Sequence, residues 1–162
     1  MIEIRRLPPE RWEDYKKIRL QALKTDSQAF GSSYEEEVLL SEVDWIRRIE
    51  NAIFALEKNE IVGTIVIFYE RGLKTRHIAS IYGFYVAPEY RGKGIAKKLL
   101  AAALEEIRKR GGILKAKLAV NSEQKVAIKV YEDAGFVLAG RMKKELLVDG
   151  RFYDELAMEK MI

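Results

Sequence analysis

The sequence has no cysteine, a single histidine and only three prolines among its 162 residues. Without cysteine it can have no disulfide framework, thiolate metal site or cysteine nucleophile. His77 alone cannot form a histidine-based metal cluster; we interpret it as a surface or strand-edge residue, with a catalytic triad the alternative. No apolar run approaches the roughly 20 residues of a membrane span, and the first residues lack the apolar core of a signal peptide. We therefore expect a cytoplasmic protein that uses neither a metal nor a membrane.

The charge balance is only mildly basic, with 29 Lys and Arg against 25 Asp and Glu, a formal net charge of +4. Basic residues mostly alternate with acidic ones, as in 105–110, which is typical of a solvated helix face. A nucleic-acid-binding protein would show a continuous basic stripe or a known binding module, and we expect no nucleic acid partner. The length and the 48% hydrophobic content suit one globular domain over residues 1–162.

Hydrophobic periodicity predicts an alternating series of strands and helices. Strands are expected at 2–6, 52–57, 61–69, 79–86, 114–120, 136–148 and 152–161. Helices are expected from Pro8-Pro9, after a cap at Ser41, over 95–110, and after a cap at Asn121-Ser122. The last helix would bury a stripe of Val126, Ala127, Val130 and Ala134. Residues 25–34 are expected to form a loop, and Asp149-Gly150 predicts a type I′ hairpin turn.

The most informative stretch is a glycine turn between a strand and a helix, Arg91-Gly92-Lys93-Gly94-Ile95-Ala96. Backbone N–H groups at a helix N-terminus have no intrahelical partner, and the helix dipole adds partial positive charge there. Glycine lets a phosphate approach the backbone closely, and Arg91 and Lys93 add full charges. The turn is not a Walker A loop, because it lacks the Ser or Thr that such a loop requires. It is not a dinucleotide fingerprint either, because the third glycine of that motif is missing.

Three motifs in order give this anion site a more specific meaning. They are residues 85–96, which include the glycine turn; Asn121 after a strand, followed by Ala127 and Tyr131; and Ala134-Gly135-Phe136 at the end of the next helix. Together they resemble the GNAT superfamily of N-acetyltransferases along the whole chain. The resemblance implies a single-domain α/β fold with a mixed, mostly antiparallel sheet of about seven strands, four helices, and a splayed fourth and fifth strand.

The resemblance also implies that acetyl-CoA is the acyl donor, and it assigns roles to residues around it. The backbone N–H of Val86 would stabilise the thioester oxygen, and Tyr131 would protonate the leaving thiolate. A thiol has a pKa of about 8.5 and a phenol of about 10, so this transfer is feasible but not strongly driven. Expected cofactor contacts are Phe84, Tyr85, Val86, Arg91, Gly92, Lys93, Gly94, Ile95, Ala96, Asn121, Ala127, Lys129 and Tyr131.

Structural roles compete with several of these assignments. Phe84 also suits an ordinary strand core, Tyr131 a packed helix position, Asn121 a helix N-cap, and Lys129 a solvated surface.

The general base is the point at which the sequence departs from the family. Many relatives carry a glutamate where this chain has Tyr82. The candidates are Tyr82 acting through a water, or an acid of the segment 33–37, which resembles the variable acceptor region of relatives. Tyr34, Glu35 and Glu36 are the expected acceptor-binding residues.

The sequence thus predicts an N-acetyltransferase in which a primary amine, on a small molecule or a peptide, attacks the thioester directly in a ternary complex. The alternative is a non-catalytic acyl-CoA-binding module on the same fold, favoured by the missing glutamate. A basic nucleic-acid-binding protein is the third hypothesis, and a homodimer stays open. The acceptor cannot be named from the sequence, because acceptor loops vary freely on one scaffold.

Overall fold

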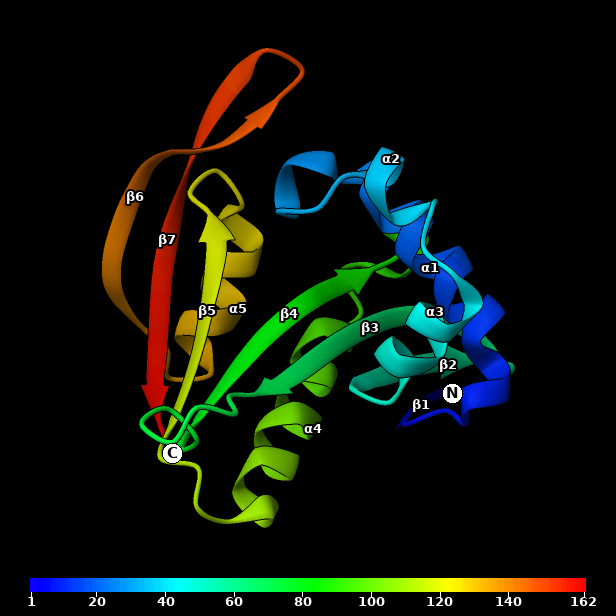
Figure 1. The fold of residues 1–162 in the computed structure, drawn as a ribbon, viewed down its shortest axis with the longest axis horizontal. Helices are drawn as coiled ribbons and strands as arrows, with labels where there is room; N and C mark the ends of the chain where they lie inside the picture. Colours follow the sequence, from blue (N-terminus) through cyan, green and yellow to red (C-terminus); the bar gives the residue numbers. More distant parts are fainter.

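The computed structural model describes residues 1–162 as one seven-stranded sheet flanked by helices (Figure 1). The sheet has the order β1-β2-β3-β4-β5-β7-β6. Its strands are β1 Ile2–Arg5, β2 Ala52–Glu57, β3 Glu60–Tyr69, β4 Ile78–Val86, β5 Lys115–Asn121, β6 Val137–Val148 and β7 Arg151–Met161. The α-helices are α1 Trp12–Thr25, α2 Tyr34–Glu37, α3 Glu42–Ile49, α4 Ile95–Arg110 and α5 Lys125–Asp133. Short 3₁₀ turns are η1 Pro9–Arg11, η2 Ser27–Ala29 and η3 Pro88–Tyr90.

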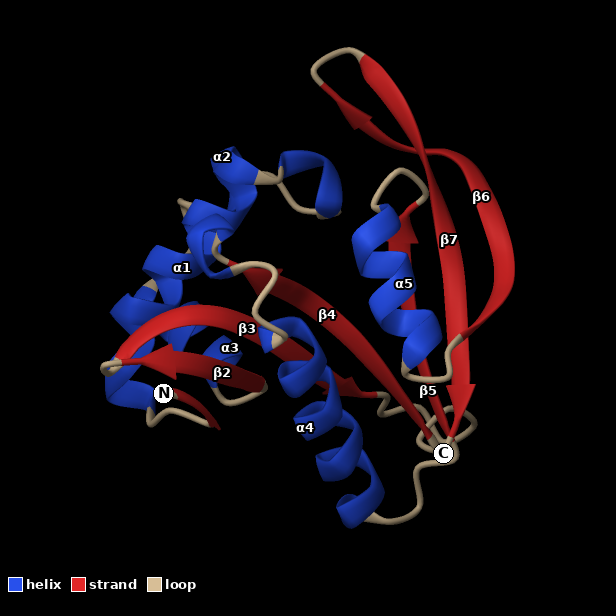
Figure 2. Ribbon diagram, turned by 180° about the vertical axis from the view of Figure 1, so that it is seen from behind, coloured by secondary structure: helices blue, strands red, loops and turns tan.

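The two faces of the sheet carry different helices. Seen from behind, α4 and α5 cover one face (Figure 2), and α1, α2 and α3 lie on the other over β2, β3 and the end of β4. Two hydrophobic clusters correspond to these layers: one is built around α4, the other around α1 and α3. Side chains along β4 alternate between them, with Val86 in the α4 cluster and Tyr85 in the α1 cluster. The end of β4 therefore belongs to both halves of the core.

The central strands β4 and β5 separate after a short contact. They pair in parallel only through 78–80 and 115–117, and beyond these rows the two strands splay apart. On its other side β4 pairs with β3 through a bulge, where Ile65 of β3 faces both Gly83 and Phe84 of β4. Gly83 has φ of 55°, a conformation that glycine adopts without strain. The bulge re-aims the last residues of β4 toward the splay.

The predicted elements are confirmed with a few corrections. Helix α4 has the predicted bounds, and Ser41 caps α3 in a capping box with Asp44. The Asp149-Gly150 turn has positive φ at both residues, as type I′ requires. The predicted helix count of four is wrong, because the acidic segment forms an additional short helix, α2, capped by Ser33.

Two local predictions are wrong. The chain at Pro8-Pro9 first forms η1, and α1 begins only at Trp12. The N-cap of α5 is Gln124, so neither Asn121 nor Ser122 caps this helix. The predicted α5 stripe is confirmed in part: Ala127, Val130 and Ala134 pack against the core, whereas Val126 is 82% exposed and Tyr131 is the most buried residue of the helix. No helix is both long and apolar enough to span a membrane.

Candidate active site

A free backbone donor lies at the end of β4. Val86 pairs with Gly63, while the next N–H, of Ala87, donates to the Val62 carbonyl. Hydrogen-bonded and non-hydrogen-bonded pairs alternate in an antiparallel ladder, so Val86 is in a non-hydrogen-bonded pair. Its N–H and C=O therefore point away from β3, to the side on which β5 has splayed away. This is the predicted oxyanion position.

Arg91 occupies the carbonyl beside that donor. Its Nε donates to Val86 O at 2.8 Å, and its Nη2 donates to Asp26 Oδ2 at 2.5 Å. The guanidinium carbon also lies 5.6 Å from the centroid of the Tyr85 ring. Arg91, which the sequence predicted to contact a phosphate, is thus engaged within the protein. Because Arg91 binds the Val86 carbonyl, the Val86 N–H is the backbone group that stays available.

The glycine turn has the geometry of an open anion site. Gly92 and Gly94 have φ of 74° and 76°, and a Cβ added at either would meet no atom within 4 Å. Gly94 is the N-cap of α4, and the Lys98 N–H makes the first intrahelical bond to its carbonyl. The N–H groups of residues 95–97 therefore have no intrahelical acceptor. Lys93 lies beside the turn, with Nζ 5.1 Å from the centroid of the Tyr90 ring.

Tyr131 is the buried centre of an aromatic cluster across the splay. Its ring centroid lies 5.6 Å from that of Phe84 and 5.9 Å from that of Phe136, so residues from α5 and β4 meet here. Burial raises the pKa of the Tyr131 hydroxyl well above its ordinary value. The phenol therefore stays protonated at neutral pH. Ala127, one turn earlier on α5, packs against the hydrophobic core cluster that contains Tyr131.

The side chains of Lys129 and Asn121 are engaged within the protein. Lys129 Nζ lies 2.6 Å from an Asp133 carboxylate oxygen, and the hydrogen bond and charge of Asp133 raise the pKa of the lysine. Asn121 is fully buried; its Nδ2 donates to Gln28 O at 2.8 Å and its Oδ1 accepts from the Glu123 N–H at 2.9 Å. The amide of Asn121 thus ties β5 to η2 across the mouth of the splay.

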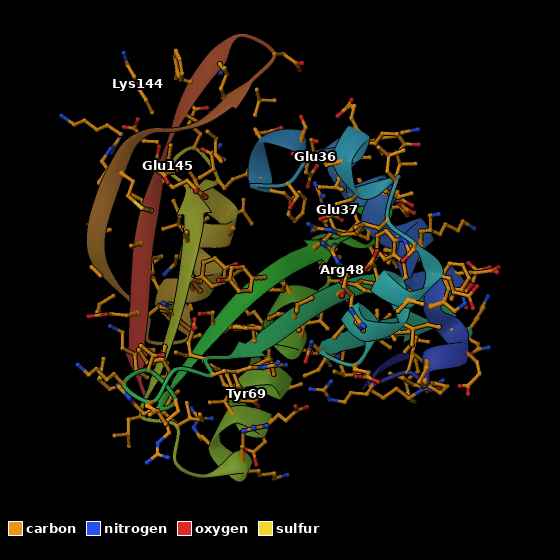
Figure 3. The ribbon with its side chains drawn as sticks, in the orientation of Figure 1. Glu36, Glu37, Arg48, Tyr69, Lys144 and Glu145 are labelled. Atoms are coloured by element: carbon orange, nitrogen blue, oxygen red, sulfur yellow. The ribbon has the colours of Figure 1, made fainter.

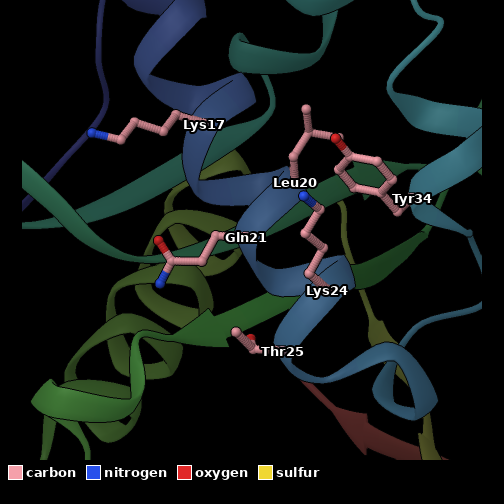
Figure 4. Close-up of a pocket in the computed structure, with 6 residues that line it drawn as sticks. All are labelled: Lys17, Leu20, Gln21, Lys24, Thr25 and Tyr34. Atoms are coloured by element: carbon pink, nitrogen blue, oxygen red, sulfur yellow. The ribbon is translucent and has the colours of Figure 1, made fainter.

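The predicted acceptor residues are spread over the α1 side of the sheet. Tyr82 is 56% exposed on β4. Tyr34 lines a pocket of about 390 Å³ against α1 (Figure 4), with Lys24 Nζ 4.3 Å from its ring centroid. Glu35 and Glu36 are exposed on α2, and the Glu36 carboxylate accepts hydrogen bonds from Ser33. The structure does not gather these four residues around one point.

Two groups of charged residues near this region were not singled out in the sequence. Glu37 is buried in a bidentate contact with Arg19 and a further contact with Arg48 (Figure 3). A charged residue beside Ile18, within the apolar stripe of α1, was the signal for Arg19. Glu155 of β7 pairs in register with Asn121. Burial and the charge of Glu145 raise the pKa of Glu155.

Comparison with known proteins now defines the family. The profile of the Acetyltransferase (GNAT) family matches residues 8–136, so the chain belongs to this family. L-amino acid N-acyltransferase MnaT of Escherichia coli is 25% identical over 85% of this chain and 90% of its own length. Spermidine N(1)-acetyltransferase of Vibrio cholerae is 33% identical, but the match covers only 48% of this chain and 45% of that enzyme.

Solved structures agree on the fold. An acetyltransferase of the GNAT family from Streptococcus pneumoniae superimposes with a TM-score of 0.90 at 22% identity, covering 100% of both chains. Phosphinothricin acetyltransferase from Sinorhizobium meliloti, solved in complex with acetyl-CoA, superimposes with a TM-score of 0.82 at 20% identity, covering 99% of this chain and 88% of that one. The chain therefore has the GNAT fold, with its splayed strands, as the motifs predicted. No group of three or more His, Cys, Asp or Glu residues is placed to hold a metal ion.

Proposed function

We propose that the protein is an N-acetyltransferase that transfers an acetyl group from acetyl-CoA to a primary amine by direct attack in a ternary complex. The observation that carries the proposal is the free Val86 N–H in the splay, which precedes the open glycine turn by six residues. It combines a donor for a developing oxyanion with a separate site for a pyrophosphate on one continuous segment.

The residues present fit coenzyme A. Residues 92 and 94 leave open space where side chains would otherwise stand, and unpaired N–H groups at the start of α4 suit phosphate oxygens. Lys93 adds positive charge there. The remaining predicted contacts are Ile95 and Ala96 at the start of α4, Phe84 and Tyr85 on β4, Asn121 at the end of β5, and Ala127 and Lys129 on α5. When bound, the donor supplies a thioester carbonyl and a thiolate leaving group.

Two groups of the protein would act on the charges that the reaction develops. The Val86 N–H donates to the carbonyl oxygen as that oxygen gains negative charge, and removal of such a donor typically costs about 10²–10³ in rate. The Tyr131 hydroxyl then gives a proton, or a strong hydrogen bond, to the departing sulfur. Because burial raises its pKa, Tyr131 is in the protonated form that a donor needs. The same shift makes full proton transfer less favourable, so the role depends on close positioning.

Removal of the amine proton is the step without an assigned residue. Tyr82 stands where many relatives carry glutamate, and Glu36 is hydrogen-bonded to Ser33. We propose that water held near Tyr82 and the backbone of β4 accepts the proton, without a single indispensable side chain. An acceptor whose amine has a low pKa needs the least help, because more of it is already neutral.

The test is turnover of acetyl-CoA with a panel of amino acids, polyamines, aminoglycosides and peptides, measured as free thiol and as acetylated product. We expect at least one amine to be acetylated in proportion to the thiol released. Tight binding of CoA together with no turnover of any amine would instead favour the acyl-CoA-binding module. Absence of both would contradict the proposal.

A further inference from the structure

The wall formed by α1, α2 and α3 contains a charge cluster that is not neutral. Arg19 Nε and Nη2 each donate to the Glu37 carboxylate at 2.9 Å, and Arg48 Nη1 lies 3.0 Å from the same carboxylate. Two guanidinium groups thus share one carboxylate. Arg19 and Glu37 are buried, and Arg48 is partly exposed. Arg19 and Glu37 neutralise each other in the buried part of the cluster, so the one excess positive charge lies on the partly exposed Arg48.

One hydrogen-bond donor of this cluster has no partner. Nη1 of Arg19 is buried and has no hydrogen-bond partner. The whole side chain is nine-tenths buried. Only two other buried side-chain polar atoms share this condition, Trp45 Nε1 and Thr64 Oγ1, and neither is charged. An unsatisfied charged donor costs more than an unsatisfied neutral one. The cluster therefore presents both a charge and a donor to an anion.

The free donor faces the part of β4 at which the acceptor is expected. A Cβ added to Gly83, at the bulge, would lie 3.7 Å from Arg19 Nη1. Gly83 precedes Val86, whose N–H is the proposed donor to the thioester oxygen, by three residues. The Phe30 ring covers the guanidinium, with its centroid 4.8 Å from Cζ. Phe30 belongs to the short connection between η2 and α2, so access to Nη1 requires this ring to move.

We propose that Arg19 Nη1, together with the β4 bulge at Gly83, forms a subsite for the carboxylate of the acceptor, and that the acceptor is an α-amino acid. This rests on the proposed N-acetyltransferase function. The other two donating nitrogens of Arg19 already bind Glu37, so the contact to the ligand is a single charge-assisted hydrogen bond. A polyamine would bring further positive charge to a cluster with excess positive charge, which disfavours that class.

The first experiment compares matched acceptors on the unmodified protein. Each of several L-amino acids is assayed beside its amide and its decarboxylated amine, at equal concentration and saturating acetyl-CoA. We expect KM to be at least tenfold lower for the acids. The amide amine is the weaker base and is more often neutral, so its intrinsic reactivity runs in the opposite direction. Equal KM values, or preference for the amide, would overturn the proposal.

The second experiment assigns the preference to Arg19. Arg19→Lys keeps the charge and one contact to Glu37 but removes Nη1; we expect it to abolish most of the acid-over-amide preference while turnover of the amide is retained. Arg48→Lys is the matched control, because Arg48 also binds Glu37 but has no unpaired buried nitrogen. It should keep the preference. Loss of the preference in both variants, or in neither, would contradict the role of Arg19.

A binding measurement covers the case in which Arg19→Lys does not fold or no amine is turned over. Calorimetric titration of the unmodified protein in the presence of CoA, with an amino acid and then its amide, reads the subsite without catalysis. Binding of the acid alone supports the subsite even if the proposed catalysis fails. Equal binding of both, or of neither, overturns it. Phe30→Ala should strengthen binding of the acid, since it removes the ring that covers the guanidinium.

Discussion

The acyl-donor side and the acceptor side of the splay use different kinds of chemical group. On the donor side, the groups proposed to function are mostly backbone: the Val86 N–H, the first N–H groups of α4, and glycines with positive φ. On the acceptor side, the candidate groups are side chains from three helices, with Arg19, Glu37 and Arg48 brought together across intervals of 18 and 11 residues in the sequence. A backbone-built site depends on a few glycines and a strand register, whereas a side-chain-built site depends on how helices pack.

The largest expected effect tests whether the donor side also needs a side chain. Tyr131→Phe deletes the hydroxyl that we propose protonates the sulfur but keeps the ring that packs on Phe84 and Phe136. Loss of a positioned proton donor typically lowers the rate by about 10²–10⁴. We expect such a fall in kcat with little change in melting temperature, measured under conditions in which chemistry limits turnover.

Tyr85→Phe is the control for that variant. Tyr85 is also a buried tyrosine at the splay, but its hydroxyl bonds to Thr25 at 3.0 Å on the α1 side. It should keep most of the activity. Nearly full kcat in Tyr131→Phe would remove Tyr131 from the mechanism and leave a donor side built from backbone alone.

The next effect tests the stability of the side-chain-built wall. Removing one partner of a buried ion pair typically costs roughly 3–5 kcal/mol, because the other charge is left buried. We expect Glu37→Gln to lose about that much in urea denaturation. Glu36→Gln is the matched control: it is the adjacent residue, exposed in a capping box that glutamine also completes. It should lose less than about 1 kcal/mol of unfolding free energy. Equal losses in the two variants would show that the buried ion cluster contributes no more to stability than the exposed capping box.

The same pair gives a pH dependence. Burial alone would raise the pKa of Glu37, but hydrogen bonds and charges from Arg19 and Arg48 outweigh it and hold the pKa below the ordinary value of 4.5. A carboxyl whose folded pKa is depressed contributes stability above its unfolded pKa and loses it as pH falls through the folded value. Unfolding free energy should therefore fall below about pH 4.5 more steeply in the unmodified protein than in Glu37→Gln, measured by denaturation at a series of pH values.

A smaller effect tests the glycine turn against the other end of the same helix. Gly94→Ala places a methyl group in the space proposed for pyrophosphate. Loss of one charge-assisted hydrogen bond costs about 1.5–3 kcal/mol, so we expect CoA to bind roughly tenfold to a hundredfold more weakly by calorimetry. Gly111→Ala is the control, since Gly111 is the C-cap of α4, also has positive φ, and also faces open space. Weaker CoA binding in both variants to the same degree would attribute the effect to helix strain.

The smallest expected effects concern the base. Alanine replacement of Tyr82, Glu35 or Glu36 and replacement of Glu155 by glutamine, one at a time, should each slow the reaction by less than about tenfold if water accepts the proton. The pH profile of kcat/KM should then rise with a pKa that follows the acceptor amine across a series. A thousandfold loss in one variant would identify a dedicated base and contradict the distributed one.

The contrast between the two sides also explains what could be read from the sequence. Glycine turns, helix caps and apolar stripes are local, so the bounds of α4, the Ser41 cap and the type I′ turn were all predicted. The role of Asn121 was ambiguous, because its bond to Gln28 joins residues 93 positions apart. The buried pairing of Glu37 with Arg19 was missed because a run of three acids looks solvated until α2 folds back on α1.

The short turn η2 links the two halves of the sheet. Just before it, Asp26 binds Arg91, which holds the β4 end; within it, Gln28 accepts a bond from Asn121 at the end of β5. The two contacting residues, Asp26 and Gln28, lie only two positions apart in the chain. The segment at η2 therefore connects the ends of β4 and β5 where the two strands have separated. Neither contact involves α2 or α3, so the separation between the ends of β4 and β5 is set by η2 and not by those two helices. Mutations can reshape the acceptor wall over evolutionary time without changing the distance that the acyl donor must fit.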